Sequence, residues 1–469
     1  MRPFALIIAL LLAACGDTAP GPTGSSAESG TVLATAETDE ARSDENGGRY
    51  EGDWSGTLDV GAAQLELVLE VRGDEAVLIS VDQGGARMPI DITQMDTDGL
   101  TGTIASVGAS MAFERIDSET LSGTFSQGGA TVPLTLERDR VRGVFFPEDD
   151  AIADDFIVMS GDVRLAGTLQ RPEGDGPFPA VLLLNGSGAQ DRNATVVGQP
   201  VFGVLADALA ERGIATLRLD DRGIGGSDAV APASPHDLAD DAVAAMAAMR
   251  GAGGVDASCA AILGHSEGGL IAFLAANEAE PAFLITLAGM HMTMADTLYD
   301  QSEAIFLASG AGQGAADRNR ALQDAMFAVM RDETVTDYPA ALTEALTALG
   351  FPEEAARQQG AIWGQDYAVA ALDLDPAFSM AEYDGPVHAF FGERDLQVRH
   401  EPQSAALSWA RRDHPTEITV VPGVNHLFQQ AETGLPEEYA TAPHAMSPEA
   451  LDLIGEAAES LITQTCTAE

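Results

Sequence analysis

A glycine-rich turn places one serine between two apolar runs, in the stretch ILGHSEGGLIAF from Ile262 to Phe273. Gly264 precedes Ser266 by two residues, and Gly268 follows it by two. A serine at a sharp strand-to-helix turn can act as a nucleophile, because the turn exposes its hydroxyl and requires small neighbours. Serine is also a common helix N-cap, and GxSxG can arise by chance in a chain with 49 glycines, so other residues must support the motif.

An acid and a base follow at the ends of two later apolar segments. A serine hydroxyl needs an imidazole to take its proton and a carboxylate to orient that imidazole. Asp395 follows VHAFFGER, and His426 follows EITVVPGVN. The carboxyl ends of parallel strands meet at one edge of a sheet, and the chain order Ser, Asp, His is typical of α/β-hydrolases. We therefore predict Ser266, Asp395 and His426 as a catalytic triad.

Two backbone N–H groups are needed to bind the oxyanion that such a serine generates. One comes from the residue after the nucleophile, which is Glu267. The other is expected from a loop after an earlier strand, and the NGSG segment Asn185–Gly188 fits that position. We predict Ser187 as the second donor.

Other charged residues at strand ends are predicted to brace loops. Asp220 and Asp221 are expected to pair with Arg222 in LRLDDRGIGGS, and Asp191 is expected to pair with Arg192. The sequence contains no HExxH motif and no paired Cys/His spacing, so we expect neither a metal nor a cofactor.

Strands and helices alternate from Phe156 onward, which predicts a mostly parallel sheet with helices on both faces. Residues 156–469 are thus expected to form one α/β domain. A long helical insertion at about 292–383 interrupts the alternation and predicts a cap over the strand ends. Trp363 and Tyr367 in this cap are candidates to line an acyl pocket, although most apolar residues there are expected to form the cap's own core.

Residues 49–142 alternate as strands with no long helical pattern, which predicts a small antiparallel β domain, a curled sheet or partial barrel. A short sequence recurs in it as WSGTL, LTGTI and LSGTF, each typical of the start of a strand.

The N-terminus predicts an export signal. Residues 1–14 carry one early positive charge and an apolar core, and LLAAC resembles a lipobox that ends at Cys15. Residues 15–48 are poor in large apolar side chains and predict a flexible tether. The protein is therefore expected to be exported and lipid-anchored to a bacterial membrane, on its periplasmic or cell-surface side. Cys259 and Cys466 could form a disulfide or be small buried hydrophobes.

The charge of the chain limits its partners. It contains 73 Asp and Glu against 24 basic residues, all of them arginine, for a formal net charge of −49. Nucleic acid and anionic headgroups would be repelled, so we expect no nucleic acid and a membrane contact through the lipid anchor alone. The absence of lysine excludes Schiff-base and P-loop lysine chemistry.

The motifs GHSEGGLIA, LRLDDRGIGGS, NGSGAQDRN, GERDLQV and NHLFQ together resemble bacterial carboxylesterases of the EstD type. The resemblance implies an α/β-hydrolase fold and a serine esterase that cleaves short- to medium-chain esters, with the triad named above. Asn185 departs from the His that often stands at this position. A serine peptidase, a thioesterase and a non-enzymatic binding lipoprotein remain alternatives, and the oligomeric state stays open.

We predict that Cys15→Ala abolishes lipidation and leaves hydrolytic activity intact, because the tether is separate from the catalytic residues. Mass spectrometry of the membrane fraction and ester hydrolysis by the solubilised protein check this. Loss of activity in the correctly folded variant would contradict it.

Overall fold

The computed structural model forms two compact units, which are described separately. The predicted signal and tether, including Cys15, lie outside the described residues. The residues that the structure describes are 50, 52–59, 64–72, 75–80, 86–96, 99–104, 107–117, 120–127, 130–138, 152–232 and 234–466.

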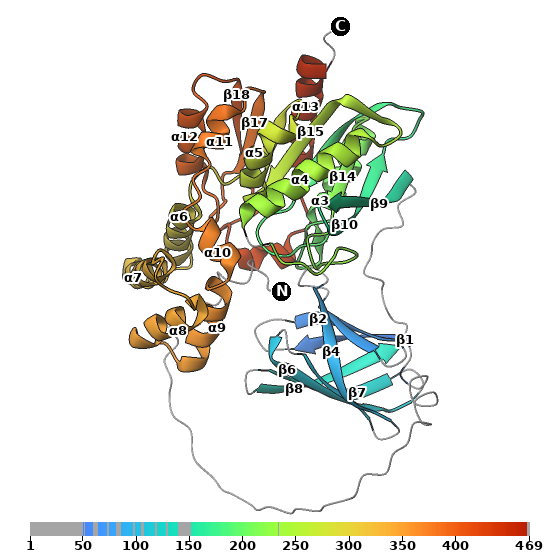
Figure 1. Ribbon diagram of the computed structural model, residues 1–469, viewed down its shortest axis with the longest axis vertical. Helices are drawn as coiled ribbons and strands as arrows, with labels where there is room; N and C mark the ends of the chain where they lie inside the picture. Colours follow the sequence, from blue (N-terminus) through green and yellow to red (C-terminus); the bar gives the residue numbers. More distant parts are fainter. Residues whose placement is uncertain are drawn as a thin grey trace, which may run out of the picture. The chain divides into compact units, whose positions relative to one another are not determined.

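The first unit is a closed antiparallel barrel of eight strands (Figure 1). The sequence predicted a curled sheet or partial barrel; closure comes from β1 and β8, where Trp54 pairs with Arg138 and Ser55 pairs with Glu137. Full closure leaves no free sheet edge. The strands are β1 (Gly52–Asp59), β2 (Gln64–Arg72), β3 (Glu75–Ser80), β4 (Ala86–Met95), β5 (Leu100–Ile104), β6 (Ala109–Arg115), β7 (Thr120–Gln127) and β8 (Ala130–Arg138).

The recurring sequence of this unit lies in strands β1, β5 and β7. Its glycines are Gly56, Gly102 and Gly123, and a Cβ at any of them would overlap the neighbouring strand. Glycine therefore permits the close strand approach that a tightly coiled barrel needs. Apolar residues such as Trp54 fill the interior.

The second unit contains an eight-stranded sheet in the order β18-β17-β16-β15-β11-β14-β10-β9. Strand β10 pairs antiparallel with β9 and β14, and the other neighbours pair in parallel. This arrangement confirms the predicted fold class. The strands are β9 (Ile152–Ser160), β10 (Val163–Arg171), β11 (Phe178–Leu184), β14 (Ala215–Leu219), β15 (Val255–His265), β16 (Leu284–Leu287), β17 (Val387–Gly392) and β18 (Thr416–Val421).

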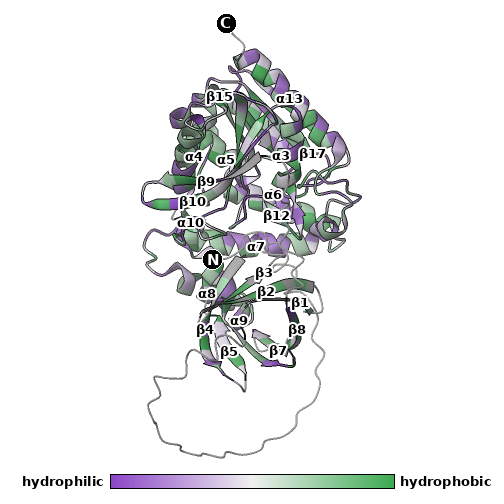
Figure 2. Cartoon of the chain, turned by 90° about the vertical axis from the view of Figure 1, so that its right-hand side faces the viewer, coloured by the Kyte–Doolittle hydropathy of each residue, from purple (hydrophilic) through white to green (hydrophobic). Residues whose placement is uncertain are grey.

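Helices cover both faces of this sheet (Figure 1). Helices α3 (Val201–Glu211) and α13 (Pro448–Cys466) pack together on one face. Helices α4 (Pro235–Arg250), α5 (Glu267–Ala279) and α12 (His400–Ala410) cover the other face. Figure 2 shows hydrophobic and hydrophilic residues interspersed along α13, as expected of a helix with one buried side.

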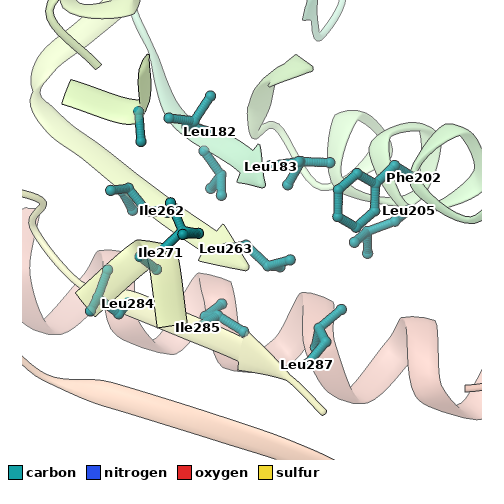
Figure 3. Close-up of a cluster of buried hydrophobic side chains, with 14 of the residues drawn as sticks. Leu182, Leu183, Phe202, Leu205, Ile262, Leu263, Ile271, Leu284, Ile285 and Leu287 are labelled. Atoms are coloured by element: carbon teal, nitrogen blue, oxygen red, sulfur yellow. The ribbon is translucent and has the colours of Figure 1, made fainter. Parts of the chain in front are cut away.

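The central strands are apolar on both sides because helices bury both faces. Leu183 of β11 points toward Phe202 and Leu205 of α3, while Ile262 of β15 lies beside Ile271 of α5 (Figure 3). Contacts of this kind hold the central strands of the sheet between two helical layers.

Six helices form the predicted cap between β16 and β17. No helix among the described residues is long and apolar enough to cross a membrane. The cap helices are α6 (Met294–Ala308), α7 (Gln313–Met330), α8 (Tyr338–Ala348), α9 (Glu353–Trp363), α10 (Asp366–Ala371) and α11 (Ala377–Glu382).

A buried arginine holds the point where the chain returns from the cap to the sheet. Arg411 is 1% exposed, and its guanidinium donates to the carbonyls of Met380 at 2.9 Å, Tyr383 at 2.6 Å and Gly385 at 2.7 Å. Burial lowers the pKa of Arg411 to about 10. The carbonyl dipoles stabilise the charge and fix the end of the cap against β17.

A disulfide joins Cys259 of β15 to Cys466, the last residue of α13. The two cysteines are 207 residues apart in sequence, so the bond closes a long loop and restricts the unfolded chain. It therefore ties the C-terminal helix to the central strand of the sheet.

We predict that Cys259→Ala/Cys466→Ala lowers the stability of this unit by about 2–4 kcal/mol and leaves kcat/KM near wild type. Activity should persist because Cys259 lies seven residues, or about 20 Å of strand, before Ser266. Thermal unfolding with and without dithiothreitol checks this, since reduction should lower the wild-type Tm and not that of the variant. Equal Tm values for the wild type and the variant under oxidising conditions would contradict the prediction.

Candidate active site

Ser266 occupies a sharp turn between β15, which ends at His265, and α5, which begins at Glu267. Its backbone has φ 55° and ψ −119°, a region that non-glycine residues rarely adopt. A Cβ on Gly264 would overlap the Gly268 carbonyl, and a Cβ on Gly268 would overlap the backbone of Leu184. The two glycines therefore permit the close approach of strand and helix that presents the serine.

Asp395 and His426 lie together at the ends of β17 and β18. The Nδ1 of His426 donates to Asp395 Oδ2 at 2.8 Å. The other carboxylate oxygen of Asp395 accepts the backbone N–H groups of Gln397 at 2.8 Å and Val398 at 2.9 Å. Three donors thus hold a carboxylate that is only 3% exposed, and it keeps the proton of His426 on Nδ1. Nε2 is then the basic nitrogen of the ring.

A compact turn positions His426. The side-chain oxygen of Asn425 accepts the backbone N–H groups of Leu427 and Gln429, both at 3.0 Å. Phe428 has φ 59°, and its N–H donates to the Asn425 carbonyl at 3.0 Å. Asparagine thus closes the turn with its own side chain, which orients the imidazole toward the acid.

His265, the residue before the nucleophile, supports the same turn. Its Nε2 lies 2.9 Å from the carbonyl oxygen of His426. Burial lowers the pKa of His265 to about 3, so the ring is neutral and donates this hydrogen bond from Nε2.

The NGSG loop packs directly against the nucleophile turn. A Cβ on Gly186 would lie 3.1 Å from Ser266 Cβ and 3.2 Å from His265 Nδ1. Ser187 follows at once, and its carbonyl accepts a 3.2 Å hydrogen bond from the side chain of Gln190. The structure therefore brings the loop with the predicted donor Ser187 to the start of α5, where Glu267 lies.

Asn185 anchors this loop through Asp221. Asn185 Nδ2 donates to Asp221 Oδ1 at 3.0 Å, and the Gln190 N–H donates to Asp221 Oδ2 at 2.8 Å. Desolvation raises the pKa of Asp221 to about 7, against the effect of these hydrogen bonds. The amide of Asn185 thus has a specific structural partner.

The predicted arginine pairs at these strand ends are wrong. Arg192 pairs with Asp220, donating to its two oxygens at 3.1 and 2.7 Å, and not with Asp191. Asp191 instead accepts backbone N–H groups, including that of Asn193 at 2.9 Å. Adjacent residues in an extended loop point apart, so a partner more distant in sequence is reached more easily.

Arg222 does not brace its neighbours Asp220 and Asp221 either. It makes a two-pronged pair with Asp241 of α4, with both contacts at 2.7 Å. A planar guanidinium matches a carboxylate in this geometry, which fixes α4 against the loop after β14.

The two predicted acyl-pocket residues are both buried in the cap. Trp363 ends α9 and Tyr367 lies in α10. The hydroxyl of Tyr367 donates to Glu267 Oε1 at 2.9 Å. Glu267 therefore contributes a buried side-chain contact as well as the predicted backbone donor. No group of three or more potential metal-ligating side chains occurs among the residues that the structure describes.

Comparison with known proteins gives two sequence matches. Residues 201–308 match the family model described as serine aminopeptidase, S33. Esterase EstD of Thermotoga maritima is 24% identical over 336 residues, covering 68% of this chain and 74% of EstD.

Solved structures also match about two thirds of the chain. Est1E from Butyrivibrio proteoclasticus, solved with ferulic acid, has 17% identity and a TM-score of 0.39, covering 66% of this chain and 98% of its own. An esterase of Pyrococcus furiosus has 12% identity and a TM-score of 0.42, with coverages of 67% and 91%.

The strand order and the match to EstD support the same conclusion. Counted from β9, the fifth strand of the sheet is β15, which leads into the nucleophile turn. The acid and the base follow the seventh and eighth strands, β17 and β18. The chain has the α/β-hydrolase fold and is similar to esterase EstD over most of its length.

Proposed function

We propose that this hydrolase is a serine carboxylesterase that cleaves short- to medium-chain esters through an acyl-enzyme intermediate. The observation that carries the proposal is the 2.8 Å hydrogen bond from His426 to Asp395. Both residues follow strands of the same sheet edge at which Ser266 follows β15. The relationship to EstD, an esterase, supports the choice of ester as substrate.

In the proposed acylation step, Ser266 Oγ attacks the ester carbonyl carbon while His426 Nε2 takes the hydroxyl proton. Asp395 stabilises the imidazolium through Nδ1–H. The backbone N–H groups of Ser187 and Glu267 bind the oxyanion. When the tetrahedral intermediate collapses, the carbon–oxygen bond to the alcohol breaks, and His426 gives its proton to the departing alkoxide.

Deacylation repeats the sequence with water. His426 removes a proton from water, the resulting hydroxide attacks the acyl carbon, and the carboxylic acid leaves as Ser266 regains its proton. No cofactor enters either step. The strongly acidic chain favours neutral esters over anionic substrates such as coenzyme A thioesters.

Aminopeptidase activity is the second candidate, because the matched family model is described as a serine aminopeptidase. We expect kcat/KM for p-nitrophenyl butyrate to exceed the values for aminoacyl-anilides and for butyryl-coenzyme A. Activity profiling of the detergent-solubilised full chain over these three substrate classes checks this. A higher kcat/KM for the anilides would replace the esterase proposal with a peptidase, and a higher value for the thioester would replace it with a thioesterase.

The triad residues should act as one unit. Ser266→Ala and His426→Ala are each expected to lower kcat by about 10⁴-fold or more, and the double variant should be little worse. Asp395→Asn should also reduce turnover strongly, because the amide favours the wrong imidazole tautomer. Ester hydrolysis, with circular dichroism to verify folding, measures these effects; multiplicative losses in the double variant would count against the assignment.

Asp220→Asn and Asp221→Asn serve as matched controls, since they remove carboxylates at a neighbouring strand end. Both are expected to alter mainly the Tm, because Asp220 binds Arg192 and Asp221 binds Asn185. Near-normal turnover by Asp395→Asn, with complete loss in either control at unchanged Tm, would show that the acid is misassigned.

A further inference from the structure

The side chain of Glu267 is shared by three parts of the hydrolase unit. It lies in the first turn of α5, directly after the nucleophile, and is 3% exposed. Its Oε1 accepts the hydroxyl of Tyr367 from cap helix α10 at 2.9 Å. The hydroxyl of Ser187 in the NGSG loop lies near the carboxyl and lowers its pKa, against the larger effect of burial. One carboxyl therefore bonds to the cap and lies where the nucleophile helix meets the NGSG loop.

An apolar side chain would occupy this position at lower energetic cost. Removing a carboxylate from water is unfavourable unless hydrogen bonds compensate, and burial raises the pKa of Glu267. Tyr367 is itself 9% exposed, and desolvation is also the main cause of its raised pKa. A buried polar contact of this kind specifies geometry more than it adds stability.

Glu267 and Ser187, which lie close together at this carboxyl, are the two residues assigned as oxyanion donors. Their backbone N–H groups must both lie about 2.7–3.1 Å from the developing oxyanion. Displacement of a catalytic group by about 1 Å can reduce the rate about 10²-fold. The NGSG loop packs against Ser266 through Gly186, and the Ser187 hydroxyl lies near the Glu267 carboxyl, so the loop and the start of α5 are held close together.

We propose that Glu267 is a positioning residue that aligns the Ser187 and Glu267 N–H donors and, through Tyr367, makes that alignment depend on docking of cap helix α10. This rests on the serine-esterase function proposed above. It assigns Tyr367 a role in transition-state stabilisation through Glu267, distinct from lining the acyl pocket.

Removal of a single hydroxyl tests the proposal with little disturbance of packing. Tyr367→Phe should lower kcat for p-nitrophenyl butyrate about 10-fold or more, with KM changed less than about twofold, because the donors act on the transition state. The dissociation constant of an alkyl trifluoromethyl ketone should rise by the same factor as kcat falls. Ser266 Oγ adds to the carbonyl carbon of this probe, and the hydroxyl proton passes to His426. The resulting oxyanion lies between the two N–H donors.

Tyr299→Phe is the matched control within the same cap. The hydroxyl of Tyr299 in α6 donates to Asp324 at 2.7 Å, so this variant also breaks a tyrosine–carboxylate hydrogen bond. It should change neither kcat nor the affinity for the ketone. Comparable losses in both variants would mean that the effect is general loosening of the cap, and would overturn the proposal.

Further variants examine the carboxyl and its neighbours. Glu267→Gln keeps an acceptor for Tyr367 and should retain more of kcat than Glu267→Leu. Tyr367→Phe combined with Ser187→Ala should lose less than the product of the two single effects, because both hydroxyls act on the Glu267 carboxyl. Full additivity would overturn the proposal, as would a raised KM at unchanged kcat in Tyr367→Phe.

Wild-type activity separates this proposal from the one on which it rests. Absence of ester hydrolysis and of Ser266 labelling by a fluorophosphonate in the wild type would reject the esterase function. Normal wild-type hydrolysis with unchanged kcat and ketone affinity in Tyr367→Phe would reject the positioning role alone. If Glu267→Leu fails to fold, Tyr367→Phe and its Tyr299→Phe control still decide.

Discussion

The backbone conformation of Ser266 is the constraint on which the rest of the site depends. A serine held at φ 55° costs on the order of 1–3 kcal/mol, and such strain persists only where the surroundings enforce it. Strand β15, which leads into the turn, packs against α4, α5 and α13, and the Ser266 N–H donates to the Leu287 carbonyl at 2.9 Å. The Ser266 carbonyl in turn accepts the N–H groups of Gly269 and Met290, both at 3.0 Å. The apolar core therefore holds in place a turn that the local sequence would not adopt alone.

Polar groups around this turn are held by contacts from distant parts of the chain. His265 bonds to the backbone of His426, and Asn185 bonds to Asp221. Glu267 bonds to Tyr367. Each of these contacts joins a loop at one strand end to a different element. An incomplete network of this kind is destabilising, because a buried polar group without a partner loses its hydrogen bonds to water and gains none in the protein.

The acidity of the chain has a structural consequence near the site. With no lysine available, every buried positive charge is an arginine, and its planar donors satisfy carboxylates and carbonyls in fixed directions. Arg192 and Arg222 each bind one aspartate with two donors, whereas Arg411 binds backbone carbonyls. The first two order loops at the strand ends, and the third fixes the return from the cap. Loop order around the nucleophile therefore depends on a few well-oriented guanidinium groups.

The sequence alone determined the fold class and the candidates for the triad. Alternating strand and helix patterns are local, and the turn at Ser266 needs glycines at fixed spacing, so both are visible along the chain. Asp395 and His426 could be selected because each follows an apolar strand in the order expected of the fold. Only the tertiary structure decided which charges pair, since the predicted partners of Arg192 and Arg222 were sequence neighbours and the observed ones are not. It likewise decided the closure of the barrel, the Cys259–Cys466 bond and the contact of Tyr367 with Glu267. Those features join residues far apart in sequence, and their geometry depends on how whole elements pack, which no local pattern encodes.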